Sequence, residues 1–203
     1  MTDIFLSCII GYAIGSLSPS YFLSKIKHQN FREKGTGNLG ATNTMLILGK
    51  SYGAFVMFFD IFKAVVAAVI AGSLFKEIPL AALISAAFAV VGHIFPFYLN
   101  FRGGKGLATF GGLILSFDPI MFLILLVITL VFMFAFNYGV AMPISAAVLF
   151  PIMALVKTKN FIVFVITTAV SLLVIFRHIP NLKKAVKKED TTVRDYLKGF
   201  IKH

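Results

Sequence analysis

The feature that most constrains this chain is a series of long apolar runs separated by short polar connections. A helix needs about 20 apolar residues to cross a bilayer, and several runs of that order follow one another along the 203 residues. The composition agrees, because 59% of the residues are hydrophobic and 13% are charged, whereas soluble domains hold about 25% charged residues. We therefore predict an all-α integral membrane protein.

The apolar runs predict about seven transmembrane helices. The predicted spans cover residues 4–23, 52–75, 80–98, 107–117, 120–136, 140–156 and 161–176. The fourth run is too short to cross alone, so we expect a short re-entrant segment in the glycine-rich stretch before it. The first run lacks the basic start of a signal peptide and is expected to remain as a span. Residues 1–182 are predicted to form a single multispan membrane domain, followed by a basic cytoplasmic tail at 183–203.

The distribution of basic residues predicts the orientation. When alternate connections are assigned to the cytoplasm, that side carries 15 of the 19 Lys and Arg residues. Cytoplasmic loops of membrane proteins are enriched in these residues, so we expect the N-terminus outside and the C-terminus in the cytoplasm. The net charge of +11 fits attraction to anionic lipid headgroups. The expected partners are therefore membrane lipids and no nucleic acid, and we expect a monomer.

Two glycine-rich stretches interrupt the apolar pattern. They read G-T-G-N-L-G-A-T-N at residues 35–43 and F-R-G-G-K-G-L-A-T at residues 101–109. Glycine is expected where backbone N–H groups approach a ligand closely or where φ is positive. Lys105 between glycines suggests an anion, such as a phosphate, held by main-chain donors and one ammonium group. The predicted topology puts both stretches on the cytoplasmic side, where they could build one site.

The glycine patterns do not indicate a nucleotide cofactor. Gly35, Gly37 and Gly40 spell G-x-G-x-x-G, but no strand is predicted before them, as a dinucleotide fold requires. The run around Lys105 lacks the Ser or Thr of a nucleotide triphosphate loop. The single cysteine is Cys8, and no Cys/His or carboxylate cluster has the spacing of a metal site. We therefore predict no metal and no cofactor.

The joint pattern resembles the bacterial acyl-phosphate:glycerol-3-phosphate acyltransferases, the PlsY family. The resemblance runs over nearly the whole chain, through G-S-L-S-P-S (15–20), the stretch at 35–43, the Asp60/Lys63 pair, G-H-I-F-P-F-Y-L-N-F-R-G-G-K-G-L-A-T (92–109) and R-H-I-P-N (177–181). It implies a seven-helix enzyme of the bacterial inner membrane with its active site at the cytoplasmic face.

The reaction that the resemblance implies moves a fatty acyl group from acyl phosphate to the 1-hydroxyl of sn-glycerol 3-phosphate. Lysophosphatidic acid and inorganic phosphate are the products. The donor is a mixed anhydride with a good leaving group, so orienting the acceptor and stabilising developing charge are the main tasks. We expect transfer in one step, without an acyl-enzyme.

The resemblance also implies roles for particular residues. The catalytic residues would be Thr36, Asn38, His178 and Asn181, with Thr36 in the family's usual serine position. The substrate-binding residues would be Gly35, Gly37, Gly40, Thr42, Asn43, Gly103, Gly104, Lys105, Gly106 and Thr109. His178 and Asn181 share one helix face only if the last helix continues that far.

Asp60 and Lys63 lie inside a predicted span, three residues apart, so they can pair on one helix face. Charged residues within a membrane are costly and usually functional. We count both among the substrate-binding residues, and two roles stay open: lining the polar site, or forming a structural pair that orients it. His93, with Pro96, is interpreted as a structural helix end that leads into the re-entrant segment.

Three departures from the family pattern fall near the expected chemistry. Leu46 replaces an arginine, Val140 replaces a serine, and Lys188 replaces the glycine of a tail element whose acid is best matched by Asp190. A leucine cannot reproduce the fork that a guanidinium offers to phosphate. A divergent paralogue with another acceptor or weak activity is therefore one alternative. A small transporter of a phosphorylated solute is another, although no internal repeat relates the two halves.

Overall fold

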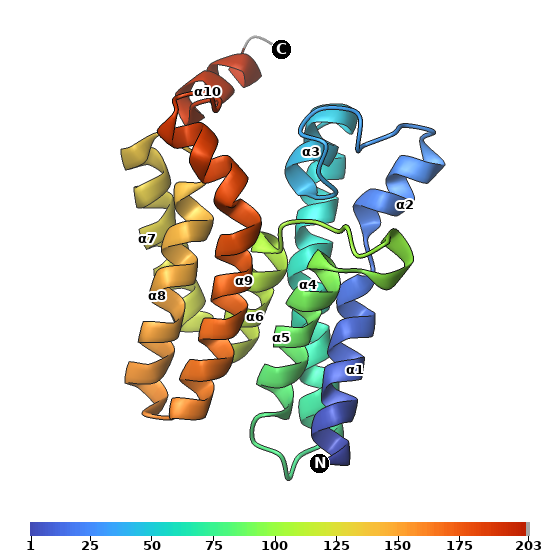
Figure 1. Ribbon diagram of the computed structural model, residues 1–203, viewed down its shortest axis with the longest axis vertical. Helices are drawn as coiled ribbons and strands as arrows, with labels where there is room; N and C mark the ends of the chain where they lie inside the picture. Colours follow the sequence, from blue (N-terminus) through green and yellow to red (C-terminus); the bar gives the residue numbers. More distant parts are fainter. Residues whose placement is uncertain (202–203) are drawn as a thin grey trace. The chain divides into compact units, whose positions relative to one another are not determined.

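The computed structural model describes residues 1–201, and over these residues it is all-helical (Figure 1). Within residues 1–201, six helical segments are long and apolar enough to cross a membrane. They cover Thr2–Ile26, Lys50–Leu74, Ala81–Leu99, Pro119–Phe136, Ala141–Thr158 and Phe161–Val186. The prediction of an all-α chain is confirmed. The chain divides into two compact units, Met1–Asp118 and Pro119–His203, and each is described by itself.

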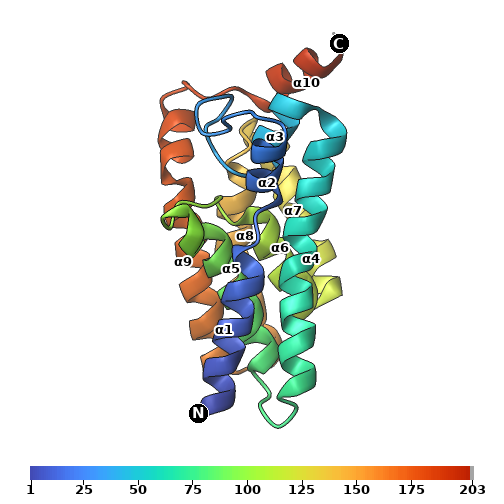
Figure 2. The ribbon, with the colours of Figure 1, turned by 90° about the vertical axis from the view of Figure 1, so that its right-hand side faces the viewer.

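The first unit is built around three long helices that run side by side (Figures 1 and 2). Its elements are α1 (Thr2–Ser16), α2 (Pro19–Ile26), α3 (Ala41–Leu48), α4 (Lys50–Leu74), α5 (Ala81–Ile94), the 3-10 turn η1 (Phe97–Leu99) and α6 (Leu107–Phe117). Helices α1, α4 and α5 form the bundle, while α2 and α3 lie at the end of the unit opposite the N-terminus.

Small residues bring α1 and α5 into close contact. A Cβ atom at Gly11 or Gly15 would lie less than 3.0 Å from the carbonyl oxygen of Ser85 or Ala89, respectively. A Cβ atom at Gly92 of α5 would meet the carbonyl oxygen of Tyr12 in the same way. Helices in membranes associate through such small residues, because apolar side chains gain little by leaving lipid. The spacing of these glycines therefore determines how α5, and the loop that follows it, sits against α1.

The first predicted span is broken where α1 ends at Ser16 and α2 begins at Pro19. Proline disfavours the helical conformation of the residue before it, and at the first position of a helix its missing N–H costs nothing. Ser18 caps α2, because its side chain accepts a hydrogen bond from the N–H of Tyr21 at 3.3 Å. The sequence predicted one span over residues 4–23 and missed this break.

Helix α6 is as short as its apolar run predicts. Its 11 residues reach about 16 Å at 1.5 Å per residue, roughly half of a hydrocarbon core of about 30 Å. It packs against α4, where a Cβ atom at Gly112 would lie less than 3.0 Å from the carbonyl oxygen of Ile61. This contact holds the start of α6, and the glycine-rich loop before it, close to the bundle of the first unit.

The second unit contains α7 (Pro119–Phe136), α8 (Ala141–Thr158), α9 (Phe161–Val186) and α10 (Val193–Ile201). Helix α8 packs against both α7 and α9. The turn between α7 and α8 also holds the start of α10, because the Asn137 carbonyl accepts from the N–H of Val193 at 3.0 Å. The side-chain oxygen of Asn137 accepts from the N–H of Arg194 at 3.1 Å.

The last span is longer than predicted. The apolar run ends at residue 176, but α9 continues to Val186 with Pro180 inside it. Polar residues and a proline conceal this continuation in the sequence. The predicted domain boundary at residue 182 falls within α9, and residues 202 and 203 of the predicted tail lie outside the described residues.

Candidate functional site

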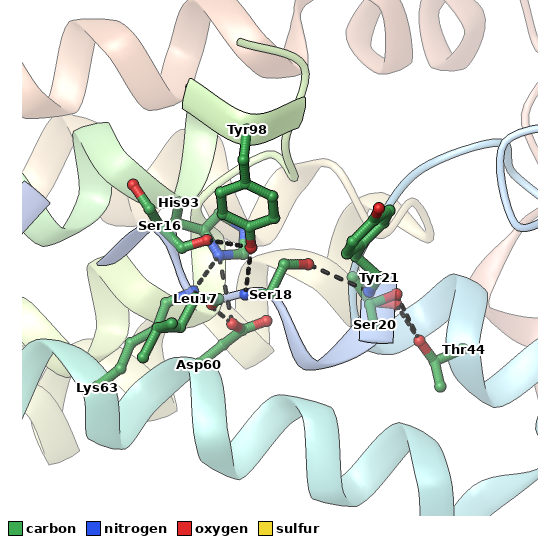
Figure 3. A network of polar contacts seen from close by, with 11 residues as sticks. Ser16, Leu17, Ser18, Ser20, Tyr21, Thr44, Asp60, Lys63, His93 and Tyr98 are labelled. Atoms are coloured by element: carbon green, nitrogen blue, oxygen red, sulfur yellow. Dashed lines mark hydrogen bonds and ion pairs between the residues drawn. The ribbon is translucent and has the colours of Figure 1, made fainter. Parts of the chain in front are cut away.

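Asp60 and Lys63 of α4 and His93 of α5 form a buried polar cluster in the first unit (Figure 3). The Lys63 ammonium donates to Asp60 Oδ1 at 2.7 Å and to the Leu17 carbonyl at 2.9 Å. Its Nζ also lies 2.8 Å from His93 Nδ1, and Asp60 Oδ1 lies 3.3 Å from the same nitrogen. The relative exposures of the three residues are only 2%, 4% and 8%, so the charges are paired inside the protein.

The cluster stabilises the break between α1 and α2. Broken helices inside a membrane need partners for their freed backbone groups. The Lys63 ammonium donates to the Leu17 carbonyl, and the Tyr98 hydroxyl bonds to the main chain on both sides of Leu17 (Figure 3). That hydroxyl donates to the Ser16 carbonyl at 2.7 Å and accepts from the N–H of Ser18 at 3.2 Å. Of the two roles left open for Asp60 and Lys63, this geometry favours the pair that orients the site.

The first glycine-rich loop is folded around Asn43. Gly35 and Gly37 have φ angles of 59° and 70°, a region that favours glycine. Asn43 Oδ1 accepts from the N–H of Thr36 at 2.6 Å, and Asn43 Nδ2 donates to the Phe31 carbonyl at 2.8 Å. Asn43 is 1% exposed. Both polar groups of the Asn43 side chain therefore bond to the main chain and shape the loop, and its role in substrate binding stays a prediction.

The remaining residues of this loop differ in exposure. Thr36, Thr42 and Gly35 are exposed, whereas Asn38 and Gly40 are partly buried. Gly40 has an extended backbone, with φ near −178°, and directly precedes α3. Thr36 and Thr42 therefore present hydroxyls at the surface of the first unit, where a ligand could reach them.

The second glycine-rich loop returns along the end of α5. The N–H of Gly103 donates to the Ile94 carbonyl at 2.9 Å, and the N–H of Gly104 donates to the His93 carbonyl at 3.1 Å. Both N–H groups, expected from sequence to surround a phosphate, thus bond to α5. Gly106 has a φ of 89° and caps the start of α6.

The two glycine-rich loops meet at Gly104. A Cβ atom there would lie 2.6 Å from the Leu39 carbonyl oxygen of the first loop, and closer still to His93 Nε2. The loops also meet at their edges, where the guanidinium of Arg32 donates to the carbonyl oxygen of Arg102. The structure therefore brings together two stretches that are about 65 residues apart in the sequence.

The start of α6 offers donors beside this junction. The first turn of a helix has N–H groups without intrahelical partners and a partial positive charge. Lys105 is partly buried just before this turn. Thr109 is fully buried within the turn, and its hydroxyl has no hydrogen-bond partner among the described residues. A buried hydroxyl in that state is unusual and could bond to a ligand.

His178 and Asn181 belong to the second unit. Both lie on α9, which is helical throughout this region, so they share a helix face as residues three apart do. His178 is 6% exposed, and its Nδ1 lies 2.8 Å from the Val174 carbonyl. A carbonyl only accepts, so Nδ1 carries a proton and donates it.

The three departures from the family pattern lie in different environments. Leu46 is 46% exposed on α3, and Val140 is 6% exposed. Val140 also lines an apolar cavity of about 530 Å³ within the second unit. Lys188 has a φ of 59°, a conformation that glycine adopts at no cost and other residues adopt at roughly 1–2 kcal/mol.

The sequence did not predict that His93 belongs to the buried cluster or that Tyr98 bonds to the chain break beside it. His93 was interpreted as a helix end, and Tyr98 was not singled out. Both lie in the stretch G-H-I-F-P-F-Y at residues 92–98, where a histidine directly before a helix end and a tyrosine near a break were the available signals. Their partners come from α1 and α4 and could not be read from local spacing.

The fold and these loops are those of an all-helical, multi-pass membrane protein in which two glycine-rich loops meet beside a buried ionic cluster. The family model described as glycerol-3-phosphate acyltransferase matches residues 5–188. The chain therefore belongs to the glycerol-3-phosphate acyltransferase family, as its motifs predicted.

Several known proteins are similar over nearly their whole length. The glycerol-3-phosphate acyltransferase of Bacillus velezensis is 33% identical, with 93% of this chain and 97% of the relative covered. That of Staphylococcus haemolyticus is 34% identical, with 92% and 96% covered. The crystal structure of PlsY (YgiH), an integral membrane glycerol 3-phosphate acyltransferase, in its glycerol 3-phosphate form matches with a TM-score of 0.86 and 28% identity. That match covers 93% of this chain and 94% of the other.

Proposed function

We propose that the protein transfers a fatty acyl group from acyl phosphate to the 1-hydroxyl of sn-glycerol 3-phosphate. The products are lysophosphatidic acid and inorganic phosphate, and the pathway served is phospholipid synthesis. Relatives covering more than nine-tenths of the chain carry the name of this activity. The related PlsY structure was solved in a glycerol 3-phosphate form and in a lysophosphatidic acid form, which are the acceptor and the product of this reaction.

The observation that carries the proposal is the meeting of the two glycine-rich loops at Gly104 beside the start of α6. Phosphate groups are commonly held by the first turn of a helix together with a lysine. Here Lys105 and the buried hydroxyl of Thr109 stand at that turn. We assign the acceptor's phosphate to these two residues, with Gly106 giving the close backbone approach.

The first loop supplies the second side of the acceptor site. Thr36, Asn38 and Thr42 offer side-chain hydrogen bonds to the glycerol hydroxyls. Arg32 and Arg102 add two guanidinium groups at the edge of both loops, where they can take the place of the arginine that is absent at Leu46. Guanidinium groups bind phosphate oxygens through paired donors.

The donor requires little activation. In an acyl phosphate the carbonyl carbon is bonded to a phosphate that leaves readily, so the 1-hydroxyl attacks the carbonyl carbon and the bond from that carbon to the phosphate oxygen breaks. The protein contributes by orienting the hydroxyl and stabilising the developing negative charge. We propose His178 and Asn181 of the R-H-I-P-N motif as catalytic residues, with His178 taking the proton of the attacking hydroxyl and Asn181 offering an amide hydrogen bond. No acyl-enzyme and no metal take part.

The membrane arrangement follows from charge. We propose seven crossings, with α6 and the re-entrant loop before it completing the fourth. The N-terminus is outside, and the C-terminus and the active site are at the cytoplasmic face of the bacterial inner membrane. The asymmetry of 15 among 19 basic residues supports this orientation. The active form is a monomer.

The test is release of inorganic phosphate by the purified protein in detergent. With acyl phosphate as donor, we expect release only after glycerol 3-phosphate is added. Glycerol and dihydroxyacetone phosphate serve as alternative acceptors, because a divergent paralogue would prefer one of them. A transporter of a phosphorylated solute would release no phosphate with any acceptor, and that result would reject the proposed enzyme.

A further inference from the structure

We propose that His93 is a positioning residue: the Asp60–Lys63 pair holds it in one tautomer, and its ring fixes the junction of the two glycine-rich loops. This inference rests on the proposed function, because the junction is assigned to the acceptor site. Neither the sequence motifs nor the names of the relatives give His93 this role.

The tautomer follows from the hydrogen bonds of Lys63. A charged ammonium has three protons and no lone pair. Its three near neighbours are Asp60 Oδ1 at 2.7 Å, the Leu17 carbonyl at 2.9 Å and His93 Nδ1 at 2.8 Å. Each neighbour takes one proton, so Nδ1 accepts. The proton of the neutral imidazole is therefore on Nε2.

The rival arrangement has Nδ1 donating to Asp60. That separation is 3.3 Å, against 2.8 Å between Nδ1 and Lys63 Nζ. It would leave one proton of a buried ammonium without an acceptor, which destabilises a buried charged group. The shorter contact and the complete set of partners favour the Nε2–H tautomer.

The protonated side of the ring faces the loops. Nε2 is the atom nearest to where a Cβ of Gly104 would stand, and the Leu39 carbonyl oxygen lies 2.6 Å from that same point. The main chain of His93 also holds Gly104, whose N–H donates to the His93 carbonyl at 3.1 Å. The side chain and the main chain of His93 thus both contact the second loop at Gly104, where Leu39 of the first loop reaches it.

The ring connects the buried ionic cluster to the site. If Lys63 fixes the plane and tautomer of the imidazole, Gly104 and Leu39 can approach only in one way. Lys105 and Thr109 follow within five residues of Gly104, so a shift at the junction moves the groups assigned to the acceptor's phosphate. We therefore expect changes at His93 to alter glycerol 3-phosphate binding more than use of the acyl phosphate.

Two substitutions separate the two sides of the ring. In His93→Asn the amide oxygen can occupy the position of Nδ1 and keep the contact with Lys63, while nothing replaces Nε2. In His93→Gln the amide nitrogen can reach the position of Nε2, while the contact with Lys63 is lost. His28→Asn is the matched control, because His28 is exposed with φ of 51°, a conformation that asparagine tolerates.

The expected results differ for the two variants. His93→Asn should melt near the wild-type temperature, and its KM for glycerol 3-phosphate should rise about 10- to 100-fold, because a misplacement of about 1 Å in the groups that hold a substrate costs up to about 100-fold. His93→Gln should melt at a lower temperature than the wild type, but its KM for glycerol 3-phosphate should rise less than that of His93→Asn. His28→Asn should match the wild type in both. Equal rises in KM for His93→Asn and His93→Gln, or a wild-type KM in His93→Asn, would reject the positioning role.

A measurement independent of activity keeps the inference testable if either variant fails to fold. In wild-type protein with 15N-labelled histidine, the one-bond nitrogen–proton coupling identifies the protonated nitrogen of each ring. We expect His93 to carry its proton on Nε2 and, in Lys63→Met, to lose this preference. A proton on Nδ1 in the wild type would overturn the inference. Absence of acyl transfer by a wild type with the expected tautomer would instead reject the proposed function.

Discussion

The contact between the two glycine-rich loops gives the sharpest prediction for a single substitution, Gly104→Ala. The added Cβ would lie 2.6 Å from the Leu39 carbonyl oxygen and closer still to His93 Nε2, both below the 3.0 Å that real Cβ contacts respect. Neither neighbour can move freely, because one is main chain and the other is bonded to Lys63. The second loop must therefore shift by about 0.5 Å to relieve the contact with Leu39 and by about 1 Å to relieve the contact with His93.

The size of the effect follows from that shift. A displacement of about 1 Å in a group that positions a substrate costs about 100-fold in rate, or about 2.7 kcal/mol. We expect kcat/KM for glycerol 3-phosphate to fall by about this factor in Gly104→Ala, mainly through KM, in a phosphate-release assay. The KM for acyl phosphate should change less.

The control for this prediction is Gly139→Ala in the turn between α7 and α8. An added Cβ at Gly139 meets no atom within 4 Å, so activity and melting temperature should equal those of the wild type. If Gly104→Ala kept the wild-type kcat/KM, the two loops would not be in contact during catalysis. If only the KM for acyl phosphate rose, the junction would hold the donor, and the assignment of the acceptor would be wrong.

Three further predictions concern the buried pair, the helix contact and the orientation. Lys63→Met leaves the Asp60 carboxylate buried without its ammonium partner and should lower the free energy of unfolding by about 3–5 kcal/mol. The double substitution Lys63→Met/Asp60→Leu should restore part of this stability in thermal melts. If the double variant melts no higher than Lys63→Met, the pair does not act as a unit. Gly15→Ala should cost about 1–3 kcal/mol, because its Cβ would overlap the Ala89 carbonyl in the contact between α1 and α5; an unchanged melting temperature would contradict this packing. A reporter fused after residue 203 should be read in the cytoplasm, and a periplasmic signal would contradict the orientation proposed from the basic residues.

Much of the helical framework could be predicted from the sequence, because spanning helices are defined by length and apolarity. The start of α6 at Leu107 and its end at Phe117 coincide with the predicted short run. The break after α1 was missed because Leu17 and Ser18 interrupt the apolar pattern only slightly. The extension of α9 past Pro180 was missed for the opposite reason, since polar residues there form helix that the hydropathy pattern does not include.

The residues assigned to the candidate site from the sequence remain a prediction, and the sequence did not indicate their hydrogen bonds. Local motifs identified both glycine-rich loops, and the charge pattern predicted that they face the same side. The sequence did not indicate that the Asn43 amide would bond to the main chain of Thr36 and Phe31. Nor did it indicate that the N–H groups of Gly103 and Gly104 would donate to carbonyls at the end of α5. These bonds join residues 7 to 12 positions apart in loops without a regular repeat, and the contact of His93 with Lys63 joins residues 30 positions apart, so no spacing rule predicts them.

The proposed transfer from acyl phosphate to glycerol 3-phosphate breaks the bond between the carbonyl carbon and the bridging oxygen, and an isotope measurement tests which bond breaks. The purified protein is given acyl phosphate carrying 18O in the oxygen that bridges carbonyl carbon and phosphorus, together with glycerol 3-phosphate. Attack on the carbonyl carbon leaves that oxygen with phosphorus, so we expect one labelled phosphate and one unlabelled lysophosphatidic acid per turnover. Label in the lysophosphatidic acid, or phosphate released without any lysophosphatidic acid, would contradict the proposed transfer.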